Sequence, residues 1–472
     1  MNADRFPSRG PEILRAGPLR LRYEPSSGFV RRIRLGDREV LRGIYAAVRD
    51  PNWISVPGTL LETRRELSQD NFRIEFECRH RRGGIDFVWH GAVTGTADGV
   101  LRYAFEGEAR STFRRNRIGL CVLHPIRECA GAPARQFRVD GSRLDCRFPD
   151  DVEPQIFGRS SFRDLRSVAH EVEPGVWAEV LFEGETFEME DQRNWTDASF
   201  KTYGTPLALP FPVEIPAGTR LRQCVTLRIE GRPGKHGNSS AEAVTRPAPP
   251  IRIGPAAGGP IRLPRLGLVL ASHGLPLDPR QIRLLRALGL SHLRVDLHAG
   301  SPDWSRLWIR ADQEATELGV DIELALHLPR DGHADEADLR LRLERSESKV
   351  ARVLALREGE PATTRETLAA VRRVVAGWGL PVGAGSDAHF CELNRERALD
   401  RCAIGDADFL FWAATPQVHA DDDLSVMETL EAHAAVVRTA RAFSGGKPLV
   451  VSPVTLRPRF NAVSTGPESA DA

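Results

Sequence analysis

Side chains that could transfer protons recur at the ends of predicted strands in the second half of the chain. They are Asp296 and His298, Glu358, Asp387 and His389, and His419. In two of these places a carboxylate stands two residues before an imidazole, as in Asp387 and His389. A carboxylate beside a histidine can orient the ring, which then acts as a general base. The pattern indicates a hydrolytic site, although strand ends also begin loops, which are polar for structural reasons.

The same residue types could bind a metal that activates water, because Asp and His are ligands in hydrolytic metal centres. The spacing is loose, however, and no HxH pair follows the first predicted strand of this half, which reads RLGLVLAS. No GxSxG, GxxxxGK[ST] or strand-coupled GxGxxG is present, which argues against a serine hydrolase elbow and a nucleotide site. We therefore expect no metal and no other cofactor.

A second group of polar residues lies in the segment from Phe187 to Tyr203, which reads FEMEDQRNWTDASFKTY. Both charge signs stand there among large aromatic rings. The candidate binding residues in it are Arg193, Asn194, Trp195, Asp197 and Lys201. Ion pairs beside apolar walls suit a pocket for a small polyhydroxylated substrate. The alternative is a surface hairpin whose charges face water and whose rings anchor it.

The elements that must position these residues differ between the two halves of the chain. Residues 1–230 contain short runs of alternating apolar and polar residues, such as Phe72, Ile74, Phe76 and Cys78 against charged neighbours. This period of two predicts half-buried strands, and many strands with few helices predict an antiparallel β-sandwich.

Residues 231–262 are rich in Pro, Gly, Ser and Ala and are predicted to be a linker. From 263 to 460 apolar strands alternate with helices, one of them with Asp278 as its N-cap and Pro279 at its first position. Repeated βα units predict a TIM-like (β/α) barrel. About seven strands can be counted, so the barrel is expected to be incomplete, and residues 461–472 are predicted to be a disordered tail.

The composition restricts the classes of binding partner that we expect. The formal net charge is +1, which gives no reason to expect nucleic acid or an anionic membrane as a partner. The seven cysteines are scattered without a CxxC. The N-terminus, MNADRFPSRGPEILRAG, lacks a signal-peptide apolar core, and no apolar run reaches membrane length. We expect a cytoplasmic protein that binds a small molecule. The composition leaves the oligomeric state open.

Several segments resemble one bacterial enzyme family. They are GTLLETRRELSQDNFRIEFEC (58–78), RNRIGLCVLHP (115–125), the stretch from 170 to 215 that contains EMEDQRNWTDASFKTY, and SPVTLRPRFN (452–461). Together they are similar to the D-apionate lactonases of apiose breakdown. The resemblance implies a β domain, a barrel domain and a small C-terminal β domain, and it implies hydrolysis of D-apionolactone to D-apionate. The last barrel strand and the C-terminal domain are expected to be absent from this chain.

Opening a lactone requires a base that directs water, donors for the oxyanion and groups that hold the sugar. We expect His389, oriented by Asp387, to be the base, and His419 or Glu358 to be the acid. Of the remaining candidates, Arg193 and Lys201 are expected to bind the oxyanion or the product carboxylate. The sugar would be held by Asn194, Trp195 and Asp197, with Asp296 and His298 as further binding residues.

Two other functions stay open. A barrel glycoside hydrolase would need two carboxylates, and Glu358 stands where such enzymes carry one of them. The seventh strand, VVSPVTL, offers no second acid, so Glu190 or Asp191 would have to supply it. An incomplete barrel would instead favour a non-catalytic sugar-binding protein.

Overall fold

The computed structural model describes residues 10–231, 262–330, 336–416, 418–419 and 422–464. Its contacts divide the chain into two compact units. The first contains Met1–Gly231, Ser386–Cys402 and Trp412–Ala472, and the second contains Arg232–Gly385 and Ala403–Phe411. Residues 232–261 of the predicted linker and 465–472 of the predicted tail lie outside the described residues.

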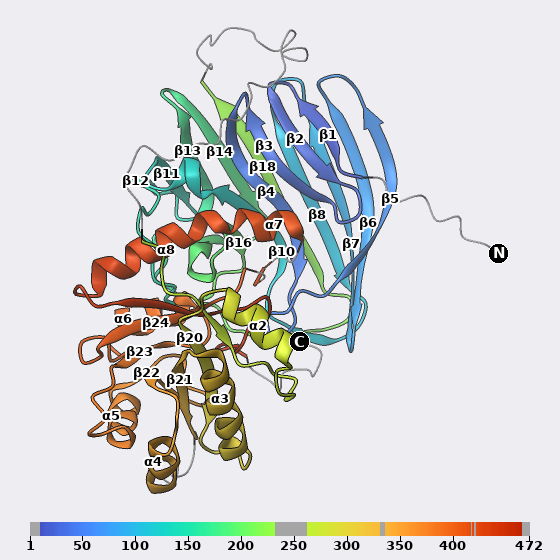
Figure 1. The fold of residues 1–472 in the computed structure, drawn as a ribbon. Helices are drawn as coiled ribbons and strands as arrows, with labels where there is room; N and C mark the ends of the chain where they lie inside the picture. The colour runs from blue at the N-terminus through green and yellow to red at the C-terminus, as the bar shows by residue number, and fades with distance from the viewer. Residues whose placement is uncertain (1–9, 232–261, 331–335, 417, 420–421, 465–472) are drawn as a thin grey trace, which may run out of the picture. The chain divides into compact units, whose positions relative to one another are not determined.

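The first unit is built on one sixteen-stranded sheet (Figure 1). Its strands follow the order β1 (Glu12–Ala16), β2 (Leu19–Glu24), β3 (Phe29–Leu35), β4 (Arg38–Val48), β10 (Ile118–Pro125), β16 (Ser199–Gly204), β15 (Phe187–Asp191), β13 (Leu165–Glu173), β14 (Val176–Glu183), β18 (Arg220–Glu230), β8 (Leu101–Ala109), β7 (Ile85–Gly95), β6 (Phe72–Arg82) and β5 (Gly58–Leu67). Two further strands, β11 (Pro133–Arg138) and β12 (Arg143–Arg147), extend it from β13. A separate two-stranded sheet pairs β9 (Phe113–Arg115) with β17 (Val213–Ile215).

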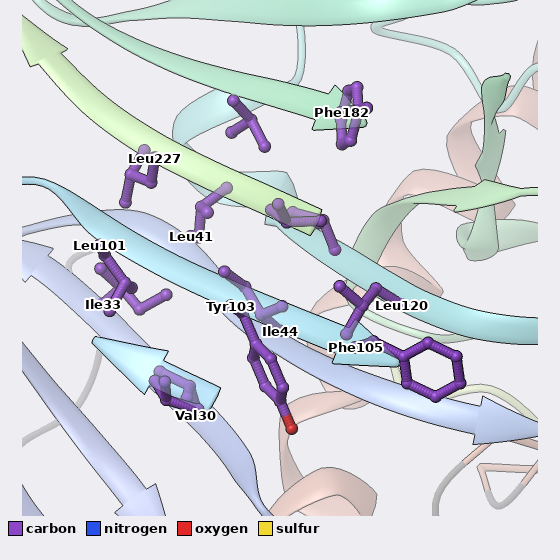
Figure 2. Packing of buried hydrophobic residues seen from close by; sticks show 14 of the residues in the cluster. Val30, Ile33, Leu41, Ile44, Leu101, Tyr103, Phe105, Leu120, Phe182 and Leu227 are labelled. Carbon is purple, nitrogen blue, oxygen red and sulfur yellow. The ribbon is translucent and has the colours of Figure 1, made fainter. Parts of the chain in front are cut away.

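The alternation expected from the sequence decides which face of each strand is buried. In β6 the side chains of Phe72, Ile74, Phe76 and Cys78 are buried, and the charged residues between them are exposed or half-buried. The inward residues of distant strands form one core, in which Val30 of β3 and Tyr103 of β8 both lie (Figure 2). Tyr103 Oη donates a hydrogen bond to the Gly28 carbonyl at 3.0 Å. The predicted antiparallel β fold is confirmed.

The segment from Phe187 to Tyr203 forms a hairpin inside this sheet. Strand β15 leads into a short 3-10 helix, η1 (Gln192–Trp195), and the chain returns as β16. The Asp191 side chain caps η1, and Thr196 ends it with a left-handed backbone (φ 66°). Every residue of the segment is buried or half-buried. The alternative of a surface hairpin with charges facing water is therefore wrong.

Three helices from the C-terminal part of the chain belong to the same unit, namely α6 (Phe390–Ala398), α7 (Asp423–Glu428) and α8 (Leu430–Phe443). One short helix, α1 (Ile126–Cys129), lies between β10 and β11. Arg31 of β3 donates to Asp422 at 2.8 Å, and Arg42 of β4 pairs with Glu428 at 2.7 Å. Asn394 of α6 donates to Asn194 of η1 at 3.0 Å. Part-buried ion pairs thus connect α7 and its N-cap residue to β3 and β4, and a buried hydrogen bond connects α6 to η1.

The second unit follows the predicted alternation of strand and helix. Its elements are β19 (Gly267–Val269), α2 (Pro279–Ala287), β20 (His292–His298), α3 (Trp304–Leu318), β21 (Asp321–Leu328), α4 (Glu336–Glu344), β22 (Val350–Arg357), α5 (Arg365–Val374) and β23 (Val382–Ser386). The chain continues through β24 (Phe409–Ala414) to β25 (Leu449–Val454), which ends the seven-stranded sheet β19-β20-β21-β22-β23-β24-β25. The paired strands from β19 to β23 run parallel. A TIM-like barrel of seven strands was predicted, and it is confirmed.

Two helix boundaries also agree with the sequence. The Asp278 side chain accepts from the backbone amides of Arg280 and Gln281, and Pro279 begins α2. Gly319 ends α3 with a left-handed backbone (φ 70°), which glycine adopts without steric cost. Within the described ranges, no helix combines the length and the apolar character that crossing a membrane requires.

Candidate active site

A cavity of about 570 Å³ lies within the first unit. Its titratable lining residues are Arg49, Arg82, Arg117, Cys121, Glu190, Lys201, Tyr203, His389, Glu392, Arg395 and His419. Apolar walls are supplied by Trp53, Phe157, Trp195, Leu207 and Phe460. The volume falls in the range of small-molecule sites, in which a few convergent polar groups fix a ligand between apolar walls.

The buried hairpin contributes an ion pair to the cavity. Glu190 of β15 and Lys201 of β16 are directly opposite each other in the antiparallel ladder, and their charged groups are in contact. Burial alone would raise the pKa of Glu190, but Lys201 and His419 outweigh it, so the pKa lies below its ordinary value. The Lys201 ammonium also stands over the Tyr203 ring, 5.1 Å from its centroid. The Glu190 carboxyl is therefore ionised inside a partly apolar site.

A histidine–carboxylate pair lies in the same cavity. Nδ1 of His419 contacts Oδ2 of Asp197 in the loop between η1 and β16. Because an ionised carboxylate only accepts, Nδ1 carries the proton and Nε2 keeps a lone pair. Burial lowers the pKa of His419, although Asp197 opposes the shift, and the ring stands edge-on to Trp195 at 5.5 Å. The pair has the arrangement of a general base and its orienting group.

Helix α6 brings three more polar side chains to the cavity. His389 is its N-cap residue, and Glu392 and Arg395 follow at intervals of three, so all three lie on one face. Burial lowers the pKa of His389 to about 4, and His419 adds to the shift, so the ring is neutral near pH 7. Arg395 Nε donates to the Gln155 carbonyl at 2.6 Å, which fixes the guanidinium.

Four of the predicted residues, His389, Trp195, Lys201 and His419, line this cavity. Asp197, a fifth, contacts His419. Asp387 forms an ion pair with Arg459 at 3.0 Å. Orientation of His389 by Asp387 stays a prediction, whereas the structure pairs His419 with Asp197.

Arg193 and Asn194 have structural roles that the sequence did not predict. The Arg193 guanidinium is 1% exposed, pairs with Asp191 at 2.7 Å, and donates to three backbone carbonyls between residues 149 and 151. Asn194 is fully buried and donates to the carbonyls of Glu153 and Asp191. These side chains donate their hydrogen bonds inside the protein and support the hairpin.

The remaining predicted residues lie in the second unit. Asp296 at the end of β20 accepts from Arg294 at 2.6 Å and lies 3.4 Å from His327. His298 lies 3.2 Å from Glu358, and its ring stacks on that of His327 with centroids 4.2 Å apart. The ends of three neighbouring strands thus hold two imidazole–carboxylate contacts side by side.

Several cavity residues were not predicted as site residues. Glu392 and Arg395 follow His389 at intervals of three, a spacing that indicates one helix face, but no helix was predicted there. Arg49 and Trp53 lie in the loop after β4, where no motif marks them. Trp53 has a left-handed backbone (φ 69°), which is unusual for a bulky residue.

Comparison with known proteins gives matches over both halves. Residues 2–232 match the family model described as D-apionate lactonase, N-terminal domain, and residues 266–471 match that of the D-apionate lactonase TIM barrel domain. A curated D-apionate lactonase from Brucella anthropi is 31% identical over 472 residues, covering 96% of this chain and 74% of that protein.

Solved structures resemble the chain more distantly. A galactose 1-epimerase from Lactobacillus acidophilus NCFM is 8% identical with a TM-score of 0.34, covering 49% of this chain and 98% of its own. An aldose epimerase homologue from C. elegans is 7% identical with a TM-score of 0.32, covering 47% of this chain and 99% of its own. These two similarities are too remote to carry an argument about function.

Proposed function

Because the chain belongs to the D-apionate lactonase family, we propose that it hydrolyses D-apionolactone to D-apionate in the cavity of the first unit. Family membership supports a lactone hydrolase. The observation that carries the assignment to this cavity is the contact between His419 and Asp197 beside the buried pair of Glu190 and Lys201.

In the proposed reaction His419 is the general base. Its Nε2 takes a proton from a water molecule as the water oxygen attacks the lactone carbonyl carbon. Asp197 holds the opposite ring nitrogen and stabilises the imidazolium that forms. The low pKa of His419 keeps the ring neutral and able to accept this proton near pH 7.

Lys201 is the proposed electrostatic partner of the developing oxyanion. An ammonium group has three donors, and the contact with Glu190 uses one of them. The others can bind the negative oxygen of the tetrahedral intermediate in a site where burial strengthens the interaction. Glu190 offsets the charge of Lys201 in the resting site, and its carboxylate can accept hydrogen bonds from sugar hydroxyls.

The substrate would be held between the apolar and polar walls. Trp195 offers a ring against which the less polar face of a sugar can lie. His389, neutral at the N-terminus of α6, can donate or accept a hydrogen bond to a substrate oxygen. These contacts would fix the carbonyl carbon within reach of the water that His419 activates.

The test is turnover of purified protein on D-apionolactone and a panel of other sugar lactones, followed by acid release. His419→Asn should lower kcat by about 10²–10⁴-fold, the usual worth of a positioned acid or base. The matched control is His90→Asn, since His90 is exposed on β7 and should tolerate the change. A wild-type protein that opens no lactone in the panel would refute the proposal.

A second candidate is glycoside hydrolysis, because two carboxyl groups, Glu190 and Glu392, line the same cavity. Turnover of chromogenic glycosides without acid release from lactones would select it. Ligand binding without either turnover would select a sugar-binding protein.

A further inference from the structure

Glu392 lines the cavity but has no assigned part in the reaction described above. It lies in the first turn of α6, between His389 and Arg395 on the face that borders the cavity. The side chain is 3% exposed. A carboxyl group this deeply buried needs either partners for its charge or a proton.

The structure gives the Glu392 carboxyl few partners. Oε1 lies 3.7 Å from Nη1 of Arg395, beyond hydrogen-bonding distance, and Oε2 is buried with no hydrogen-bond partner among the described residues. Arg395 directs its shorter contacts elsewhere, to the Gln155 carbonyl at 2.6 Å and Cys391 Sγ at 3.1 Å. An ionised form of Glu392 would therefore keep one buried oxygen, Oε2, without a hydrogen bond from the described residues.

The environment favours the protonated form. Burial raises the pKa of Glu392, although Arg395 and the backbone amides of Glu392 and His389 oppose the shift. His389 lies on the same helix face, and burial lowers its pKa to about 4. Burial raises the pKa of the Cys391 thiol well above its ordinary value, and the nearby carboxylates of Glu190 and Asp191 add to that shift. Glu190 itself has a lowered pKa because Lys201 and His419 outweigh its burial. One cavity thus holds two carboxyl groups, Glu190 and Glu392, whose pKa values are shifted in opposite directions. Such a pair commonly marks one group as the acid and another as a charged group in catalysis.

We propose that Glu392 is the general acid of the reaction and delivers a proton to the ring oxygen that leaves the carbonyl carbon. This assignment rests on the proposed lactone hydrolysis. An alkoxide is a poor leaving group, so the ring oxygen needs a proton donor as its bond to the carbonyl carbon breaks. His419 acts as the base in the same reaction and is not available as this donor.

Protons and electrons balance in the proposed hydrolysis. The water oxygen bonds to the carbonyl carbon while Nε2 of His419 takes one water proton. The bond from the carbonyl carbon to the ring oxygen then breaks, its electron pair goes to that oxygen, and the proton of Glu392 forms the new hydroxyl. Proton transfer from the His419 imidazolium to the Glu392 carboxylate, through solvent, restores both groups. One lactone and one water give one hydroxy acid.

The experiment compares wild type with Glu392→Gln on the lactone that wild type opens fastest and on the matching thiolactone. A thiol with a pKa of about 8.5 leaves as the thiolate and needs no proton donor. We expect Glu392→Gln to lose about 10²–10⁴-fold in kcat on the lactone and far less on the thiolactone. In wild type, kcat should fall as the pH rises through the pKa of the acid, and this limb should disappear in the variant.

Glu396→Gln is the matched control, because Glu396 lies on the same helix, pairs with Arg401 at 2.9 Å and does not line the cavity. It should keep the wild-type rates and pH profile. Equal losses on lactone and thiolactone with an unchanged pH profile would overturn the assignment, as would full lactone activity in Glu392→Gln. A wild type that opens no lactone would instead refute the proposed function, and the assignment with it.

Discussion

Glu190 and Lys201 face each other across the β15–β16 ladder and bring opposite charges into contact inside a cavity. Each side chain is less than a tenth exposed. Removing two ions from water is costly, and their attraction offsets that cost only when both are present. The pair therefore links the fold of the hairpin to the electrostatics of the site.

Replacing one member of this pair should destabilise the protein more than replacing both. Lys201→Met leaves the Glu190 charge buried without its partner, which should cost about 3–5 kcal/mol in the free energy of unfolding. Lys201→Met combined with Glu190→Gln should recover much of that loss, because no unpaired charge remains. Urea unfolding of the wild type, both single variants and the double variant measures the coupling. Additive losses would show that the two charges do not depend on each other.

The pH dependence of stability should carry a contribution from His389. Its pKa is about 4 in the folded protein and 6.5 in its ordinary state, so between these values the unfolded chain binds more protons. Stability from this group is fully present above pH 6.5 and is lost as the pH falls toward 4, by about 1 kcal/mol per pH unit.

Unfolding free energies of His389→Asn and wild type between these pH values test the point. Asn keeps the preference for the N-cap position of α6, so the variant removes the titration with little change to the helix. The slope should be shallower in His389→Asn and unchanged in His90→Asn, whose ring is exposed. Identical slopes in all three proteins would mean that His389 titrates as it does in the unfolded chain.

Arg193→Met should lower the free energy of unfolding and leave kcat on the lactone close to that of the wild type. The guanidinium pairs with the buried Asp191 and holds the backbone from Pro149 to Asp151. Its loss should cost about 3–5 kcal/mol, since Asp191 loses the partner of a buried ion pair. At a temperature where the variant is folded, kcat on the lactone should stay close to wild type. A large fall in kcat with unchanged stability would restore Arg193 to the oxyanion role that the sequence suggested.

Much of the fold could be predicted because local rules determine it. The alternation in β6 and the capping of α2 by Asp278 depend on neighbours only a few residues away. Seven strands could be counted in the second half because each is an apolar run between helices.

The site was harder to predict, because its contacts join residues far apart in the sequence. His419 and Asp197 are 222 residues apart, and nothing local to either residue indicates the other. The hairpin shows a second limit of prediction from sequence. Its mixed charges are compatible both with an exposed hairpin and with a buried network of ion pairs. Cavity residues far away in the sequence, such as His389 and Phe460, decide that Glu190 and Lys201 are enclosed.

The choice between two sets of strand-end residues can be decided by paired substitutions. His389 lines the cavity of the first unit, whereas Glu358 contacts His298 in the second. If the cavity is the active site, His389→Asn should lower kcat/KM on the lactone by about tenfold or more, the loss of a positioned polar contact to the substrate. Glu358→Gln, which keeps the shape and loses the charge, should have a much smaller effect. Steady-state rates and thermal unfolding of both variants separate lost chemistry from lost folding. A dominant effect of Glu358→Gln in a folded protein would move the reaction to the strand ends around Asp296, His298 and His327.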